Sequence, residues 1–574
     1  MPVTEAARRG PRLALLLIGV ALSATLSTRV DAQAPKLIRL VDTDKAYVRT
    51  IDGELKRTLP PFQARHAFQL GEVPAQPHLR FSIGLSPADE KQRMRFEVVL
   101  LQPKGSMKNL YSAELDAPGW VDVDLDLSNA EIGGAQLLLN TTMVEGKNRY
   151  NAVWGEPILL PGTGPADRSV ILISIDTLRA DHVGVYGYEK ARTPVLDALA
   201  RNGVWYTAAY SASTWTYPSH ASLLDGVYPT ALLPLGVKPR PDTDFPQSLA
   251  HWFGDAGYLT AGFTGGGFLS DKFGFPAAFD TYYMFAQPAH PEGACPEDRL
   301  DGPQVFARAR RWLSAVGSRP FFLFVHTYEV HDRCPVWPAG IGPFADWPNP
   351  GPAGRERLIS YYDTMLSQAD ALVGGLLSEL DKHGLADRTI IVVTGDHGEA
   401  FWEHGFYGHG CPREPYEPLI HVPLILRVPD EKRHGPIDQP VSAVDVAPTV
   451  LALAGLPRPP IMQGYVLPGL GLDGRPQAAP VYVHCENQLA VRIGDHKLIT
   501  ARDTPAADQL FDVKRDPEEK RNLIADDPAV AQSLRAQAAA YRSNGWAGAG
   551  RMPTDGRELD EPTRERLRAL GYLQ

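Results

Sequence analysis

Cysteine is scarce in this chain, with only four in 574 residues. Their spacing fits no zinc-ribbon pattern, which excludes that kind of structural metal site. In an oxidising compartment they can form one or two disulfides, and the sequence leaves the pairing open. They are Cys295, Cys334, Cys411 and Cys485.

Positive charge is also in deficit, because 57 lysines and arginines face 67 acidic residues and the net charge is −10. A nucleic-acid partner is therefore not expected. Past residue 32 no segment is apolar enough over sufficient length to span a bilayer, so no transmembrane span is expected after residue 32. No internal repeat is present.

The first 32 residues are typical of an export signal. Three arginines precede the apolar segment Leu13–Leu26, and Val30-Asp31-Ala32 has the small-x-small form of a cleavage site. We therefore expect cleavage after residue 32 and a periplasmic or secreted protein. The alternative is an uncleaved membrane anchor.

The remaining chain divides into three regions by its hydrophobic pattern. Residues 33–165 contain short alternating runs separated by turn residues, which predicts an all-β sandwich. This accessory domain is either a ligand-binding module or a structural cap. Residues 166–470 alternate strands with helices, which predicts an α/β catalytic domain. Residues 471–574 predict a small C-terminal α+β subdomain and tail.

Polar side chains follow several predicted buried strands of the α/β domain. Asp176 follows the strand at 170–175, His326 follows that at 321–325, and Asp396 and His397 follow that at 389–393. Ligand sites of open α/β sheets lie beyond the carboxyl ends of the strands. We expect these side chains to lie together, and two carboxylates with an imidazole suit a divalent Zn²⁺, Mn²⁺ or Ca²⁺.

Thr216 is the candidate nucleophile. It precedes Pro218, where we expect a helix to begin, and free N–H groups at a helix N-terminus favour an anionic ester. A threonine hydroxyl is a weak nucleophile, so a metal held by Asp176, Asp396 and His397 would have to activate it. Thr216 is then also a metal contact.

Further histidines can protonate the leaving group or stabilise an oxyanion. His220, His331 and His409 are the catalytic candidates, and His326 and His404 are weaker ones. A lone histidine is more often a hydrogen-bonded core or surface residue. Their number and their positions after the motif strands favour a site.

In order, these segments resemble the sulfatase family of the alkaline phosphatase superfamily. The resemblance covers residues 166–570 and rests on 173–182, 216–226, 324–331, 394–399, 408–410, 422–424 and 510–523. It implies an alkaline-phosphatase-like mixed sheet sandwiched by helices. It also implies metal ligation by Asp176, Asp396 and His397, and Thr216 at the nucleophile position. His331 would lie near the leaving group and His409 where the family has a substrate-contacting Lys or His.

Three positions depart from the family pattern. Thr177 replaces the second Asp of an Asp-Asp pair, His220 replaces the signature Arg, and Thr216 replaces the Cys that sulfatases convert to formylglycine. Hydrated formylglycine expels sulfate with its second oxygen, and threonine has only one. A phosphothreonine can instead be resolved by attack of water at phosphorus.

These features predict a metal-dependent hydrolase or transferase of phosphate or phosphonate esters. A sulfuric ester hydrolase that uses Thr216 directly is the first alternative. The second is a non-catalytic protein whose sandwich binds a glycan or envelope polymer. The expected partner is an anionic ester, carried on a small molecule or on such a polymer.

Overall fold

The structure is a computed structural model of the whole chain. It describes residues 37–41, 47–161, 168–229, 248–285, 301–317, 319–331, 350–410, 413–472, 474–501, 504 and 507–543. The predicted export signal, most of the predicted linker at 161–165, the tail beyond 543 and three of the four cysteines lie outside these residues. Among the described helices, none has the length and apolar character needed to cross a membrane.

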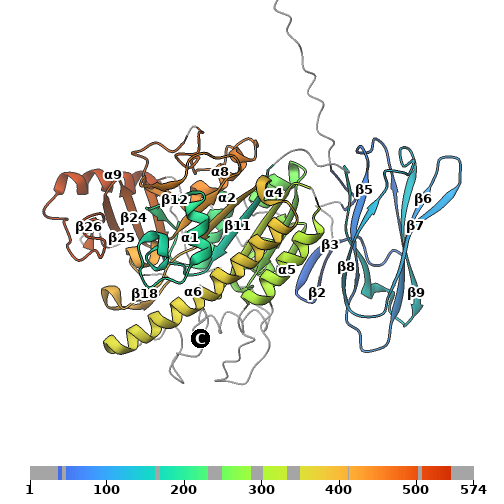
Figure 1. The fold of residues 1–574 in the computed structure, drawn as a ribbon, viewed down its shortest axis with the longest axis horizontal. Helices are drawn as coiled ribbons and strands as arrows, with labels where there is room; N and C mark the ends of the chain where they lie inside the picture. Colours follow the sequence, from blue (N-terminus) through green and yellow to red (C-terminus); the bar gives the residue numbers. More distant parts are fainter. Residues whose placement is uncertain are drawn as a thin grey trace, which may run out of the picture. The chain divides into compact units, whose positions relative to one another are not determined.

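A mixed sheet runs through the centre of the α/β region (Figure 1). Five neighbouring strands in it are parallel, in the order β17-β11-β16-β14-β15, and β20 runs antiparallel beside β17. The predicted mixed α/β fold is confirmed. The strands are β11 (Ser169–Ile175), β12 (Val204–Tyr206), β14 (Leu259–Thr264), β15 (Thr281–Met284), β16 (Phe321–Thr327), β17 (Thr389–Gly395), β20 (Leu424–Arg427) and β21 (Gly435–Ile437).

Helices cover both faces of this sheet, because its strands are apolar on both sides. Ile171 and Ile173 of β11 pack in a core with α1, α5 and α6, whereas Val170 and Leu172 pack in a second core with α2, α4 and α8. Side chains of successive strand residues point to opposite faces, which produces this division. The helices are α1 (Pro194–Arg201), α2 (Thr216–Asp225), α4 (Leu249–Asp255), α5 (Gly302–Ala315), α6 (Gly351–Lys382), α7 (Glu417–Ile420) and α8 (Val446–Leu453).

The N-terminal region consists of two antiparallel sheets around their own apolar core. One sheet has the order β4-β9-β6-β7, and the other contains β3, β10, β5 and β8. This is the arrangement predicted by the alternating runs. The strands are β1 (Ile38–Arg39), β2 (Tyr47–Ile51), β3 (Glu54–Thr58), β4 (Arg65–Gln69), β5 (His78–Leu85), β6 (Arg93–Leu101), β7 (Met107–Leu115), β8 (Gly119–Asp126), β9 (Gln136–Glu145) and β10 (Ala152–Leu160).

The two regions share a sheet, because β3 pairs antiparallel with β15. Ion pairs reinforce the junction. Arg39 lies 2.7 Å from Asp280, and Arg319 of the α/β region lies 2.6 Å from Asp124 of β8. The sandwich is therefore bonded to the central sheet through its main chain as well as through side chains.

The C-terminal region is a four-stranded antiparallel sheet with one helix packed on it. Its strands are β23 (Val481–Cys485), β24 (Gln488–Ile493), β25 (His496–Ala501) and β26 (Gln509–Asp512), and its helix is α9 (Pro528–Ser543). Lys497 of β25 lies 2.8 Å from Glu417 of α7 and 2.6 Å from Glu519. This buried cluster attaches the C-terminal sheet to the α/β region.

Candidate active site

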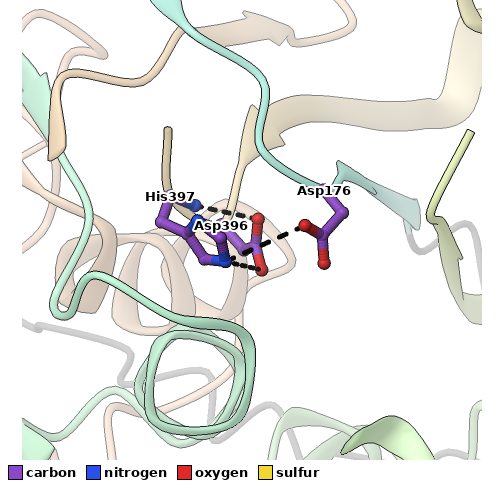
Figure 2. Close-up of side chains that lie close together, drawn as sticks. All are labelled: Asp176, Asp396 and His397. Atoms are coloured by element: carbon purple, nitrogen blue, oxygen red, sulfur yellow. Dashed lines mark hydrogen bonds and ion pairs between the residues drawn. The ribbon is translucent and has the colours of Figure 1, made fainter. Parts of the chain in front are cut away.

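Asp176, Asp396 and His397 converge at the carboxyl ends of β11 and β17, as Figure 2 shows. One ligand atom from each lies within 4.8 Å of the others, and all three residues are buried. The Nε2 atom of His397 lies 3.4 Å from Oδ2 of Asp396 and 3.8 Å from Oδ1 of Asp176. The structure thus brings together the three side chains that sequence reasoning had placed at the ends of different strands.

The electrostatics of this group favour a bound cation. Burial, followed by the charge of Asp396, raises the pKa of the Asp176 carboxyl well above its ordinary value. Burial also raises the pKa of Asp396 and lowers that of His397 to about 4. Oδ1 of Asp176 is buried without a hydrogen-bond partner in the described residues. Two ionised carboxylates buried close together repel each other and lose their hydration, which costs free energy unless a positive charge compensates them. Together with a neutral imidazole they form a ligand set that suits a divalent cation.

Thr216 lies beside this triad as the first residue of α2. Its hydroxyl donates to Oδ2 of Asp176 at 3.2 Å and lies 3.4 Å from Nε2 of His397. The helix begins two residues before Pro218, where the sequence predicted its start, so the threonine itself is in the first turn. The N-terminal end of a helix carries a partial positive charge, which favours an anion there.

Thr177 has a strained main chain, with φ of 56° in the left-handed region. β-branched residues seldom adopt this conformation, and such strain concentrates at functional sites. The strain directs its N–H to Oδ1 of Asp396 at 3.2 Å. Its own hydroxyl is buried without a hydrogen bond in the part of the chain described. A neutral side chain thus occupies the position where the family pattern has a carboxylate.

His220 lies in α2 one turn after Thr216, and both of its ring nitrogens are engaged by the protein. Nδ1 donates to the main-chain oxygen of Thr216 at 2.9 Å, so Nε2 accepts from the Ser174 hydroxyl, also at 2.9 Å. Nδ1 also lies 3.3 Å from Oδ2 of Asp396. Burial lowers the pKa of His220 to about 4, which leaves the ring uncharged at neutral pH. Ser174 was not identified from the sequence, although a hydroxyl in the apolar run of β11 was a usable signal.

His331 and His409 form the other side of the site. Their ring centroids are 5.0 Å apart, and the His409 ring lies 4.5 Å from that of His397. Glu399, which was not singled out from the sequence, lies 3.5 Å from Nδ1 of His409. All of these side chains are buried. Two imidazoles and a carboxylate next to the triad can bind and protonate an ester oxygen.

The two weaker histidine candidates lie in different places. His326 is buried, with Nε2 3.5 Å from Oδ2 of Asp176 and its ring 4.7 Å from that of His220. His404 lies in an exposed turn, and its ring stacks on Tyr416 at 3.6 Å. Among the described contacts, those of His404 do not include the triad or Thr216. The structure therefore places His326 with the site and His404 outside it.

Arg179 is a buried cation near the site, but its charge is already balanced. It pairs with Asp181 at 2.7 Å and with Glu403 at 3.1 Å, and it donates to the main-chain oxygen of Glu399 at 2.8 Å. It therefore orders the strand-end loops rather than presenting a charge to an anion.

The fold and site define a class of protein. An α/β sheet flanked by helices carries a buried hydroxyl at a helix N-terminus beside two carboxylates and an imidazole, which is suited to metal-assisted ester hydrolysis. The sulfatase family model matches residues 168–456, and this chain belongs to the sulfatase family. A second model, the C-terminal region of N-sulphoglucosamine sulphohydrolase, matches residues 402–543. The chain is a sulfatase-family hydrolase.

Among its relatives is an N-acetylgalactosamine-6-O-sulfatase of Bacteroides thetaiotaomicron, 24% identical over 479 residues, which cover 64% of this chain and 91% of the relative. A phosphonate monoester hydrolase of Agrobacterium radiobacter shares the fold with a TM-score of 0.54 and 19% identity, over 66% of this chain and 96% of that one. A third relative is a solved structure of a protein in complex with its substrate, D-glucosamine-2-N,6-O-disulfate. It has a TM-score of 0.51 and 20% identity, and the match covers 66% of this chain and 98% of that one.

Proposed function

We propose that this protein is an exported, metal-dependent hydrolase or transferase of phosphate or phosphonate esters that uses Thr216 as its nucleophile. The observation that carries the proposal is the position of the Thr216 hydroxyl, 3.2 Å from Asp176 and in the first turn of α2. The metal would be Mn²⁺, Zn²⁺ or Ca²⁺, held by Asp176, Asp396 and His397. A divalent cation held by these residues would lower the pKa of the threonine hydroxyl and would neutralise the ester oxygens.

The protein's own groups account for the remaining chemistry. The first-turn N–H groups of α2 orient the anionic ester, and Oδ2 of Asp176 accepts the Thr216 proton. A bond forms between Oγ1 and phosphorus while the bond to the leaving oxygen breaks. His331 or His409 protonates that oxygen. Water then attacks phosphorus and passes its proton to that histidine, while the bond from phosphorus to Oγ1 breaks and Asp176 returns the proton to Oγ1, which releases phosphate. Attack of another hydroxyl in place of water makes the same enzyme a transferase.

His220 acts in this scheme through Thr216 and does not touch the substrate. Both of its nitrogens are bonded within the protein, at 2.9 Å each. It fixes the main-chain oxygen of Thr216 and hence the direction of Oγ1. We assign it a positioning role in place of the proton donation expected from the sequence.

Sulfate ester hydrolysis is the second candidate, because the chain belongs to the sulfatase family and its relatives carry sulfatase names. The threonine argues against it. A sulfothreonine has no second oxygen with which to expel sulfate, whereas a phosphothreonine can be opened at phosphorus. A non-catalytic protein is disfavoured, since a decayed site has no physical reason to keep two buried carboxylates 3.8 Å or less from one imidazole.

The expected export is supported by one feature of the described chain. Cys485 is disulfide-bonded, and disulfides persist in oxidising compartments. The expected signal at 1–32 and this disulfide together favour a periplasmic or secreted protein.

The test is turnover of matched aryl phosphate monoester, phosphodiester, phosphonate and sulfate substrates by residues 33–574 with each metal. Thr216→Val removes the hydroxyl and keeps the shape, and Thr216→Ser keeps the hydroxyl. We expect phosphoester or phosphonate turnover that falls at least ~1000-fold in Thr216→Val and less in Thr216→Ser. A phosphoryl group on Thr216 in a quenched reaction would support the intermediate. Turnover of sulfate alone would overturn the proposal.

A further inference from the structure

Three exposed aromatic rings gather on the N-terminal sandwich. Tyr47 of β2, Phe62 in the turn after β3 and Tyr150 in the turn between β9 and β10 are 44%, 48% and 47% exposed. The rings of Tyr47 and Phe62 meet edge to face with centroids 5.7 Å apart. Soluble proteins expose large rings singly, and a group of them marks an interaction site.

Two arginines belong to the same cluster. The guanidinium of Arg149 lies 5.5 Å from the ring of Tyr150 and donates to the main-chain oxygen of Phe62 at 3.4 Å. Arg49 donates to the main-chain oxygen of Tyr150 at 3.5 Å. These contacts join the three aromatic segments into one surface. Tyr47, Phe62, Tyr150, Arg49 and Arg149 are called the aromatic–arginine patch below.

Neither arginine of the patch makes an ion pair among the described residues. Other arginines of the sandwich do have carboxylate partners, as in the pairing of Arg95 with Glu114 at 2.7 Å. In a chain with a net charge of −10, two unpaired guanidinium groups at one place form a local positive site. Guanidinium groups bind sulfate, phosphate and carboxylate oxygens in a forked geometry.

We propose that the aromatic–arginine patch binds an anionic polysaccharide. Flat aromatic rings stack on the apolar faces of sugar rings, and the arginines supply the charge that an acidic substituent requires. A neutral polymer would leave both guanidinium groups without a partner. The net negative charge of the rest of the chain repels an anionic polymer, which would confine binding to this patch.

The patch is a second site, separate from the triad of Asp176, Asp396 and His397. Its residues belong to β2 and to turns of the sandwich, whereas the triad lies at the ends of β11 and β17. Binding at the patch requires no turnover, so this proposal and the phosphoesterase proposal can fail independently.

The experiment measures binding of dextran sulfate, and of uncharged dextran as its matched control, to residues 33–574 carrying Thr216→Val. Affinity electrophoresis reports retardation by each polymer in the gel. We expect retardation by dextran sulfate only, and weaker retardation as salt rises, because ions screen exposed charges. Equal retardation by both polymers, or by neither, would overturn the proposal.

Substitutions then locate the site. Arg149→Gln and the triple change Tyr47→Ser, Phe62→Ser, Tyr150→Ser should each weaken dextran sulfate binding about tenfold. Lys104→Gln makes the same charge change at an exposed lysine elsewhere in the sandwich, and Met107→Ser removes an exposed apolar side chain that is 72% accessible. Both controls should bind like the parent.

Two further results would contradict the assignment. If Lys104→Gln weakens binding as much as Arg149→Gln, the attraction is general and no patch exists. If vesicles of anionic phospholipid bind and dextran sulfate does not, the surface contacts a membrane instead. Thermal unfolding of each variant identifies any loss of binding that is due to misfolding, and Arg149→Lys keeps the fold and charge while removing the forked geometry.

Discussion

The hydroxyl of Ser174 lies 2.9 Å from Nε2 of His220, and the opposite nitrogen of that ring holds the main-chain oxygen of Thr216 at 2.9 Å. These two hydrogen bonds connect β11 to the first turn of α2 through buried groups only. It occupies the place where the family pattern has an arginine beside the nucleophile. An uncharged histidine held from both sides supplies geometry there without charge.

Ser174→Ala should therefore impair catalysis without impairing substrate binding. Loss of the hydroxyl frees the His220 ring to rotate, and misdirection of Oγ1 lowers kcat by about tenfold while KM stays within about twofold. Ser174→Thr keeps the hydroxyl on a β-branched side chain that suits a strand, and it should restore most of kcat. Steady-state kinetics of both variants measures the difference. An equal fall in kcat for the alanine and threonine variants would show that only packing is affected.

Thr177→Asp should raise metal affinity by about tenfold or more, because it adds a carboxylate beside Asp176 and Asp396. Asp tolerates the left-handed main chain at φ of 56° better than threonine, so the fold should not suffer. Thr177→Asn is the matched control, with the same shape and no charge. Calorimetric titration with Mn²⁺ reports the affinity directly. A gain shared by both variants would assign the effect to relief of strain.

Asp225→Asn should stabilise the protein increasingly as pH rises. Burial alone raises the pKa of the Asp225 carboxyl well above its ordinary value, and its Oδ2 has no hydrogen-bond partner among the described residues. The folded state therefore holds a proton that the unfolded chain releases above its pKa of 3.8. Between the unfolded and folded pKa values the parent loses up to about 1.4 kcal/mol of unfolding free energy per pH unit relative to the variant.

Urea unfolding of the parent and Asp225→Asn at a series of pH values from 4 upward measures this slope. The difference should be small near pH 4 and grow from there. A constant difference across the series would mean that the carboxyl titrates normally in the folded state.

Lys497→Met should destabilise the protein by about 3–5 kcal/mol, because it leaves Glu417 and Glu519 buried without their cation. The two carboxylates lie 2.8 and 2.6 Å from the lysine nitrogen. Adding Glu519→Gln to the lysine variant removes one uncompensated charge and should recover part of the loss. Chemical unfolding of the single and double variants tests the coupling, and additive losses would contradict it.

The strands that could be predicted are those with continuous apolar runs. β11, β16 and β17 are buried on both faces, so their sequences carry the signal directly. β14 was not predicted, because it contains Gly262, where a Cβ would collide with the ring of Tyr282. Close packing against a neighbouring strand thus removed the hydrophobic signal. The β-sandwich was predicted because its strands alternate.

The candidate site also has features that the sequence predicts and features that it does not. The convergence of Asp176, Asp396 and His397 follows from the rule that parallel strands end at one edge of a sheet. The hydrogen bonds of both His220 nitrogens could not be predicted from the sequence, because they depend on how α2 packs on β11. The aromatic–arginine patch was also hidden, since its residues come from three turns and strands up to 103 positions apart, from 47 to 150. Only the folded chain brings such residues together.

The pairing of β3 with β15 has a consequence for any attempt to shorten the protein. Residues 33–165 lie before a predicted domain boundary, which suggests that they can be removed without harm to the remaining chain. The cut would strip β15 of its partner and leave a bare row of main-chain donors and acceptors along the central sheet. Such an edge recruits strands from other molecules, so the isolated catalytic region is expected to aggregate when it is expressed. Point substitutions, rather than deletions, are the means of separating the roles of the two regions.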